Sequence, residues 1–271
     1  MVRFKIRKSV AKYLVVMAIL AILTVSYVAA QTVPKPPTAL TVGTTGGRSE
    51  STQGFQVPAQ AGNVSALVVS DTTKPKFWQG YFGNVTGTIA LQDVNNQTLF
   101  QWELPNPAGE IYAVNTTSAV NWNNVTCVNF TGNASGDALG SRNMINLSNL
   151  AIQYNMNTTV TLENLSKEGL NYTFNTTFSG TFQTGTKATV SSDNCPQVTT
   201  FVDGVYQTST FKEVLMHDNK SALIFVGLLE LNKNGYQSGA NDLSDFQMLV
   251  AEDGSSGHEA ASTYYFYVEL S

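Results

Sequence analysis

The sequence has little charge. Charged side chains make up 13% of the 271 residues, about half the usual share, and Asn, Ser, Thr and Gln fill the deficit. After residue 30 there are ten basic and 19 acidic side chains, a net charge of about −9. Because nucleic-acid binders need a basic footprint, this balance argues against a nucleic-acid partner. Neutral polar residues in this number are typical of an exported protein that is solubilised by something other than its own charges.

Residues that carry catalysis or bind metal ions are scarce as well. The two histidines, His217 and His258, have no spacing that matches a metal triad. The chain has no Gly-x-Ser-x-Gly elbow, no Gly-rich phosphate loop and no EF-hand pattern. We therefore expect a protein that is not an enzyme and that has no cofactor and no metal site.

Acidic pairs are the remaining candidates for chemistry. Glu103 with Glu110 could serve glycoside hydrolysis, and Asp242 with Asp245 could bind calcium. Any chain with 19 acidic residues offers such pairs. Turn capping is therefore the favoured role of Asp242 and Asp245, and a glycan-acting hydrolase is the weakest functional hypothesis.

The first thirty residues are typical of an export signal. Residues 1–12 carry five basic and no acidic side chains, and residues 13–30 carry no charge and end in Val28-Ala29-Ala30. A basic region, an apolar core and small residues at the cleavage site describe a secretory signal peptide. The alternative is an uncleaved membrane anchor, because an apolar run of about 18 residues is near the lower limit for spanning a bilayer. Both hypotheses place residues 31–271 outside the cell, either secreted or anchored to the membrane through residues 13–30.

The two cysteines, Cys127 and Cys195, are predicted to form a disulfide. An even number of cysteines in an exported chain indicates disulfide bonding, with two free thiols as the alternative. The bond would close a loop of about 68 residues, which the chain-entropy model values at about 4 kcal/mol.

The strongest signal is the number of Asn-x-Ser/Thr sequons. With 24 Asn and 53 Ser and Thr among 271 residues, chance placement predicts about five. The sequence has thirteen, at Asn63, Asn84, Asn96, Asn115, Asn124, Asn129, Asn133, Asn146, Asn157, Asn164, Asn171, Asn175 and Asn219. Because such acceptors lie on the surface of exported proteins, we expect a heavily glycosylated protein. Only Asn219 lies after residue 175, so the C-terminal part is either a sugar-poor contact face or the inner sheet of the domain.

Residues 31–55 are predicted to be a flexible linker. Residues 31–37 are rich in Pro, and residues 41–54 are rich in Gly, Thr and Ser. A strand donated to a sheet is the alternative, because Ala39–Val42 alternates weakly between apolar and polar residues.

From residue 56 onward the hydrophobic pattern has a period of two, which predicts strands. Ala222–Glu230 is apolar nearly throughout, which indicates a strand buried on both faces. Asp93–Asn96 is predicted to be a hairpin turn. Further strands are expected at Ala66–Val69, Val85–Leu91, Thr98–Leu104, Glu110–Val114, Val125–Phe130, Tyr172–Phe178, Thr186–Val190, Phe211–His217, Asp245–Val250 and Ser262–Leu270. We therefore predict an all-β fold, a single large antiparallel β-sandwich of jelly-roll or Ig-like type over residues 56–271, with a subdivision near residue 200 left open.

Aromatic residues between Phe77 and Trp102 are the candidates for a binding surface. Exposed Trp78, Tyr81 and Trp102 could stack on sugar rings. The favoured alternative is that they fill the core, because aromatic side chains bury large areas.

Residues 78–87 and 99–102, with the closing aromatic strand 264–270, resemble uncharacterised exported surface proteins of archaea. The resemblance covers most of residues 75–271 and implies a location rather than a mechanism. The density of sequons is similar to that of archaeal surface-layer, pilus and thread-like filament glycoproteins.

Three functional hypotheses follow. The first is a structural or adhesive cell-surface glycoprotein that contacts other surface proteins or copies of itself, in part through exposed strand edges. The second is a carbohydrate-binding module with Trp78, Tyr81 and Trp102 as its platform. The third is the glycan-acting hydrolase. Exposure of these aromatic residues in a line would favour the second hypothesis over the first.

Overall fold

The computed structural model describes residues 33–43, 56–58, 60–69, 75, 77–115, 120–128, 168–185, 187–188, 195–202, 205–206, 210–218, 222–236, 243–252 and 262–270. The expected leader, residues 1–30, and most of the expected linker lie outside these ranges. Within them, no helix is both long and apolar enough to cross a membrane.

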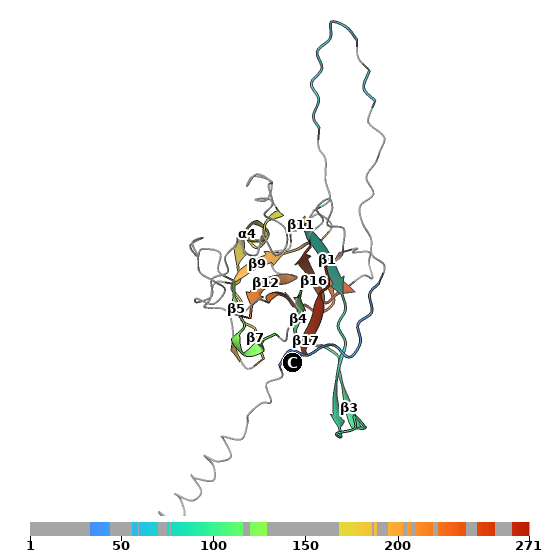
Figure 1. The fold of residues 1–271 in the computed structure, drawn as a ribbon. Coiled ribbons are helices and arrows are strands. Elements are labelled where there is room, and N and C mark those ends of the chain that lie inside the picture. The colour runs from blue at the N-terminus through green and yellow to red at the C-terminus, as the bar shows by residue number, and fades with distance from the viewer. Residues whose placement is uncertain are drawn as a thin grey trace, which may run out of the picture.

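A seven-stranded antiparallel sheet forms the centre of the molecule (Figure 1). Its strands run in the order β17, β4, β13, β12, β9 and β6, and β5 pairs with the end of β12 that β9 leaves open. The strand bounds are β4 Gly109–Val114, β5 Thr126–Cys127, β6 Thr176–Thr177, β9 Pro196–Thr199, β12 Lys212–His217, β13 Leu223–Leu228 and β17 Tyr265–Leu270. The predominance of antiparallel β structure confirms the predicted fold class at this level.

Both faces of the sheet are covered. Strand β13 is buried at five of its six positions, which confirms the prediction made from its apolar run. Successive side chains of a strand point to opposite faces, so Phe225 of β13 enters one core while Ile224 and Val226 enter the other.

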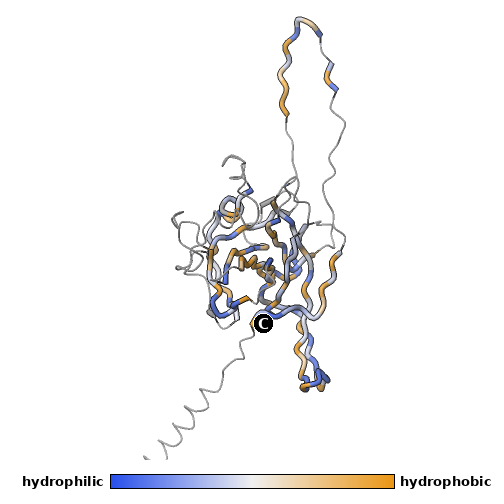
Figure 2. The backbone as a smooth tube through the Cα atoms, viewed as in Figure 1, coloured by the Kyte–Doolittle hydropathy of each residue, from blue (hydrophilic) through white to orange (hydrophobic). Residues whose placement is uncertain are grey.

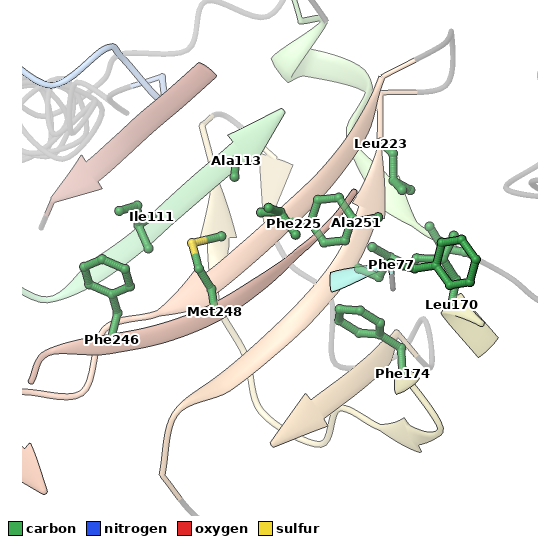
Figure 3. Close-up of a cluster of buried hydrophobic side chains, with 13 residues drawn as sticks. Phe77, Ile111, Ala113, Leu170, Phe174, Leu223, Phe225, Phe246, Met248 and Ala251 are labelled. Atoms are coloured by element: carbon green, nitrogen blue, oxygen red, sulfur yellow. The ribbon is translucent and has the colours of Figure 1, made fainter. Parts of the chain in front are cut away.

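The first core lies between the sheet and an antiparallel pair formed by β1 (Trp78–Gly83) and β16 (Phe246–Ala251). Phe225 from the sheet and Met248 from β16 meet there, as Figure 3 shows. The short helix α4 (Leu170–Thr173) and the residue after it add Leu170 and Phe174 to the same core.

The second core lies on the opposite face and contains the disulfide. Cys127 in β5 is bonded to Cys195, with the two Cα atoms 4.9 Å apart, which confirms the predicted pairing. Phe178 and Phe182 pack beside it with their ring centroids 5.6 Å apart. The disulfide therefore joins two segments at the same buried face of the sheet.

Smaller antiparallel pairs complete the described structure. They are β2 (Gly87–Gln92) with β3 (Thr98–Leu104), β7 (Gln183–Thr184) with β8 (Lys187–Ala188), β10 (Phe201–Val202) with β11 (Val205–Tyr206), and β14 (Lys233–Asn234) with β15 (Leu243–Ser244). A 3-10 turn, η1, spans Trp122–Asn124.

One predicted strand is wrong in its first half. Tyr172–Phe178 was expected to be extended, but α4 spans Leu170–Thr173 and β6 covers only Thr176–Thr177. Leu170 and Phe174 lie four residues apart, the spacing that places two side chains on one side of a helical turn. Both are buried in the first core, so tertiary packing overrides the local alternation.

The low number of sequons after residue 175 has a structural correlate. Strands β12, β13 and β16 are each buried at five of their six positions. A bulky glycan on an inward-facing side chain of these strands would have to enter a packed core. Burial of these strands is what the inner-sheet hypothesis expects of the described part of this region.

The first described residues lie on the edge of the sheet. Lys35 and Val268 of β17 exchange two backbone hydrogen bonds, of 3.1 and 2.8 Å, and Pro34 beside them is buried. Residues 39–42, the weakly alternating stretch of the expected linker, form no strand and are exposed. Among the described residues of this segment, Lys35 is the one that forms a β-bridge with the sheet.

Candidate functional site

The hairpin of β2 and β3 projects from the body of the protein (Figure 1). The predicted turn is present between the strands. Asp93 Oδ1 accepts hydrogen bonds from the backbone N–H groups of Asn95 (2.9 Å) and Gln97 (2.8 Å). Asn96 adopts a left-handed conformation with φ of 61°, which asparagine tolerates better than most residues. Local sequence therefore explains where the chain reverses.

The two faces of this hairpin differ sharply. The register pairs Ile89 with Trp102 and Leu91 with Phe100, so that these four apolar side chains share one face. The opposite face carries Thr88, Ala90, Gln101 and Glu103. The rings of Phe100 and Trp102 pack edge to face with centroids 4.7 Å apart. We call the surface of Ile89, Leu91, Phe100 and Trp102 the apolar hairpin face.

The apolar hairpin face is exposed. Its four side chains are between 48% and 55% exposed. Fully burying one such side chain is worth about 1.5–3 kcal/mol, so on the order of several kcal/mol of apolar burial is unrealised. An isolated two-stranded hairpin is marginally stable in water. These properties are typical of a surface that another molecule or segment covers.

A second exposed apolar stretch lies at the other end of the molecule. Residues 64–69, which we call the apolar arm, form no strand and extend away from the body (Figure 1). Val64 and Val68 are fully exposed and Val69 is nearly so. Figure 2 shows this stretch as hydrophobic in the upper projection, opposite the hairpin. The strand predicted at Ala66–Val69 is thus an extended segment without a sheet.

The aromatic residues proposed for sugar stacking do not form one platform. The Trp78 indole N–H donates a 2.7 Å hydrogen bond to the Glu168 carbonyl, and its ring packs against Phe174 and Phe225. Tyr81 packs edge to face on Phe266, with centroids 5.3 Å apart. Trp78 and Tyr81 therefore belong to the margin of the first core.

Trp102 lies apart from Trp78 and Tyr81, on the apolar hairpin face, where it is 48% exposed. The exposed aromatic pair of the molecule's hairpin is therefore Phe100 with Trp102. Phe100 was missed by the sequence-based prediction. The alternation of Thr98–Leu104, which places Phe100 and Trp102 on one side of a strand, was the signal that could have found it.

The described sequon asparagines lie at accessible positions. Asn63, Asn84, Asn96, Asn124 and Asn175 are exposed, and Asn115 is half-buried. Asn171 lies in α4, and the remaining sequons lie outside the described ranges: Asn129, Asn133, Asn146, Asn157, Asn164 and Asn219. None of the six described side chains would have to leave a core to carry a glycan.

A buried carboxyl pair lies on neighbouring strands of the central sheet. Glu110 of β4 is directly opposite Glu269 of β17, and both are buried. Glu269 accepts hydrogen bonds from the Tyr112 hydroxyl (3.2 Å) and from the backbone N–H of Gly185 (2.9 Å). Burial, and then the negative charge of Glu269, raise the pKa of Glu110 to about 8. Burial also raises the pKa of Glu269, against the lowering effect of its hydrogen bonds to Gly185 and Tyr112.

Because the pKa of Glu110 is raised in the folded protein, we expect the protein to become less stable as the pH rises. The pKa of Glu110 is higher in the folded protein than in the unfolded chain, so folding favours its protonated form. Its contribution is complete below pH 4.5 and is lost as the pH rises through about 8. We expect the free energy of unfolding to fall across this window by at most about 1.4 kcal/mol per pH unit for one proton. Glu110→Gln should flatten this slope, as measured by urea unfolding at several pH values.

The control for the Glu110→Gln variant adds a carboxyl group at an exposed position. Gln101→Glu, on the polar face of the hairpin, should leave the slope as it is in the wild-type protein. A Glu110→Gln variant that keeps the full wild-type slope would contradict the assignment.

Other buried acidic residues have structural roles. Asp245 accepts hydrogen bonds from the backbone N–H groups of Val85 (2.8 Å) and Asn232 (2.9 Å), so it joins the segments that follow β1 and β13; Asp242, its predicted partner, lies outside the described residues. Glu213 of β12 is fully buried and accepts a 2.8 Å hydrogen bond from the backbone N–H of Leu249. Burial raises the pKa of Glu213 well above its ordinary value.

The other candidates for chemistry do not converge. His217 is buried at the end of β12, and His258 lies outside the described residues. Glu103 is exposed on the hairpin, whereas Glu110 is buried in the sheet. Among the residues that the structure describes, no group of three or more His, Cys, Asp or Glu is placed to hold a metal ion.

Comparison with protein-family models, curated proteins and solved structures finds no match for this chain. The functional conclusion therefore depends on the residues and their arrangement.

Proposed function

We propose that this protein is a structural or adhesive glycoprotein of the cell surface, built as a β-sandwich ectodomain behind an export signal or membrane anchor. The observation that carries the proposal is the combination of exposed sequon asparagines with two exposed apolar elements. Sugars at the asparagines would solubilise a chain with few charges. The apolar elements would supply contacts to neighbouring molecules.

The position of the sequon at Asn96 supports a role in contact rather than in simple coating. Asn96 lies at the tip of the hairpin, in its turn, and not among the four residues of the apolar hairpin face. A glycan there would extend beyond the tip. The apolar face would stay accessible between the sugar and the body of the protein.

Binding of carbohydrate by the hairpin is the second candidate. Phe100 and Trp102 are exposed and adjacent, which favours it. Two properties argue against it. The two rings are inclined at 66° to one another rather than coplanar, and their neighbours on the same face are aliphatic. Sugar recognition combines aromatic surface with polar groups that fix orientation, and the apolar hairpin face has few of these.

Native purification from the cell surface, followed by intact mass measurement and glycopeptide mapping, tests the proposal. We expect a mass well above 29.3 kDa, with glycans at Asn63, Asn84 and Asn96. Negative-stain electron microscopy of the same sample should show ordered assemblies. A mass equal to that of the bare peptide would contradict the glycoprotein proposal. Glycosylated, dispersed molecules that bind a glycan array through Trp102 would favour the second candidate.

A further inference from the structure

We propose that the apolar arm of one copy packs against the apolar hairpin face of a second copy, so that the protein associates head to tail with itself. The inference deepens the proposed surface role and rests on it for the biological setting. It names the partner, a second copy of this chain, and the two segments that meet.

The first step is that the apolar arm, like the apolar hairpin face, is an apolar surface that nothing covers in the described structure. The apolar arm has no charged residue, and its alternating sides are Val64, Ala66 and Val68 on one, and Ser65, Leu67 and Val69 on the other. A strand that is apolar on both sides is typical of one covered on both faces. In the described structure the arm is bare on both.

The second step is that the dimensions match. The arm has six residues, β2 has six and β3 has seven. An extended chain of six residues is about 20 Å long, the length of the hairpin strands. The apolar hairpin face carries no charged side chain, so neither surface would bury an unpaired charge in the contact.

The third step is that the two elements project from opposite ends of the molecule (Figure 1). In this arrangement the arm does not reach the hairpin of its own copy. A contact between different patches on two copies is heterologous, and repetition of it generates rings or open filaments. An open filament of this kind has a free arm at one end and a free hairpin at the other.

The root of the hairpin packs against the body of the protein, which fits a hairpin that presents its apolar face to a second copy. At Gly87 an added Cβ would lie 2.5 Å from a methyl carbon of Leu270, so the hairpin is seated closely on the end of β17. The root of the hairpin is thus packed against the end of a strand of the central sheet.

Cysteine cross-linking of the full-length ectodomain tests the contact directly. Val68→Cys and Leu91→Cys variants are purified separately, mixed and oxidised. We expect a disulfide-linked dimer that forms only in the mixture. Ala90→Cys is the matched control, because Ala90 is the neighbour of Leu91 on the opposite face, and it should give no dimer with Val68→Cys.

Charge insertion provides an independent measurement. Val68→Asp and Phe100→Asp should each weaken self-association at least about tenfold in analytical ultracentrifugation, because either places a charge in the apolar contact. Gln60→Asp, outside the arm, and Gln101→Asp, on the polar hairpin face, should leave it unchanged. All four positions are exposed, and circular dichroism checks that each variant folds.

Three results would overturn the inference. A dimer of Leu91→Cys with itself would show hairpins packing on one another. A link within one chain of the Val68→Cys/Leu91→Cys double variant at high dilution would place the arm on its own hairpin. A glycosylated protein that stays monomeric at every concentration would also overturn it, while leaving the glycoprotein proposal intact. A protein that assembles without glycans would contradict the glycoprotein proposal and leave the inferred contact intact.

Discussion

Removal of the disulfide should lower the free energy of unfolding by about 4 kcal/mol. The bond between Cys127 and Cys195 closes a loop with a sequence separation of 68 residues, and a crosslink of this span restricts the unfolded chain strongly. Both cysteines are buried beside Phe178 in the second core. We expect the Cys127→Ala/Cys195→Ala variant to unfold at a much lower denaturant concentration than the wild-type protein, as followed by fluorescence.

Reduction of the wild-type protein is the control for this variant. It removes the crosslink but keeps both sulfur atoms in the core, so it separates loop closure from lost packing. If loop closure dominates, the reduced protein and the double variant should lose similar stability. An unchanged unfolding midpoint in both would contradict the role assigned to the bond.

Truncation of Phe225 to alanine should lower the free energy of unfolding by about as much as removal of the disulfide. Phe225 is fully buried at the centre of β13, and its ring lies 6.0–6.4 Å from the rings of Trp78, Phe174 and Tyr264. Phe→Ala in a packed core costs about 3–5 kcal/mol, because it removes apolar burial and leaves a cavity. Figure 3 shows how Phe225 extends from the sheet toward the facing layer. Thermal unfolding followed by near-UV circular dichroism would measure the loss.

Phe100→Ala is the matched control, since it makes the same substitution on the exposed hairpin. In monomeric protein we expect a change of about 0.5 kcal/mol. If Phe225→Ala lowered the free energy of unfolding no more than Phe100→Ala, this would contradict the packing of β1 and α4 over the sheet.

The contact of Phe225 with Trp78 also explains why Trp78 lies at the margin of the first core. From sequence, the dense aromatic stretch that begins at Phe77 suits a core, the favoured interpretation, but also a sugar platform. The outcome depends on Phe225 and Phe174, which are distant in the chain and become neighbours of Trp78 only when β1 pairs with β16. Local alternation does not contain that information.

The carboxyl pair shows the same limit. Tyr112 and Glu269 are 157 residues apart in the sequence yet share a hydrogen bond, and Glu110 faces Glu269 because β17 adds to the edge of β4. The sequence offers Glu103 as the partner of Glu110, but Glu103 lies on the exposed hairpin. Which carboxyl groups meet is set by strand order, and strand order is a property of the whole sheet.

Some features were determined by the sequence alone. The number of sequons, the low charge and the features of residues 1–30 depend on composition and local order, so the proposal of an exported glycoprotein needs no knowledge of the fold. The Asp93–Asn96 turn, the alternation of Thr98–Leu104 and the apolar run of β13 depend on neighbouring residues, and each predicted its element correctly. The pairing of Cys127 with Cys195 needed only that there are two cysteines.

Tertiary structure decided which apolar residues are covered. The aliphatic runs of β13 and of the apolar arm look alike in sequence, yet one is the centre of a sheet and the other is bare. Burial depends on what packs against a segment, and residues distant in the chain supply that partner. The exposure of the apolar arm and of the apolar hairpin face, from which the self-association is inferred, therefore became visible only in the folded molecule.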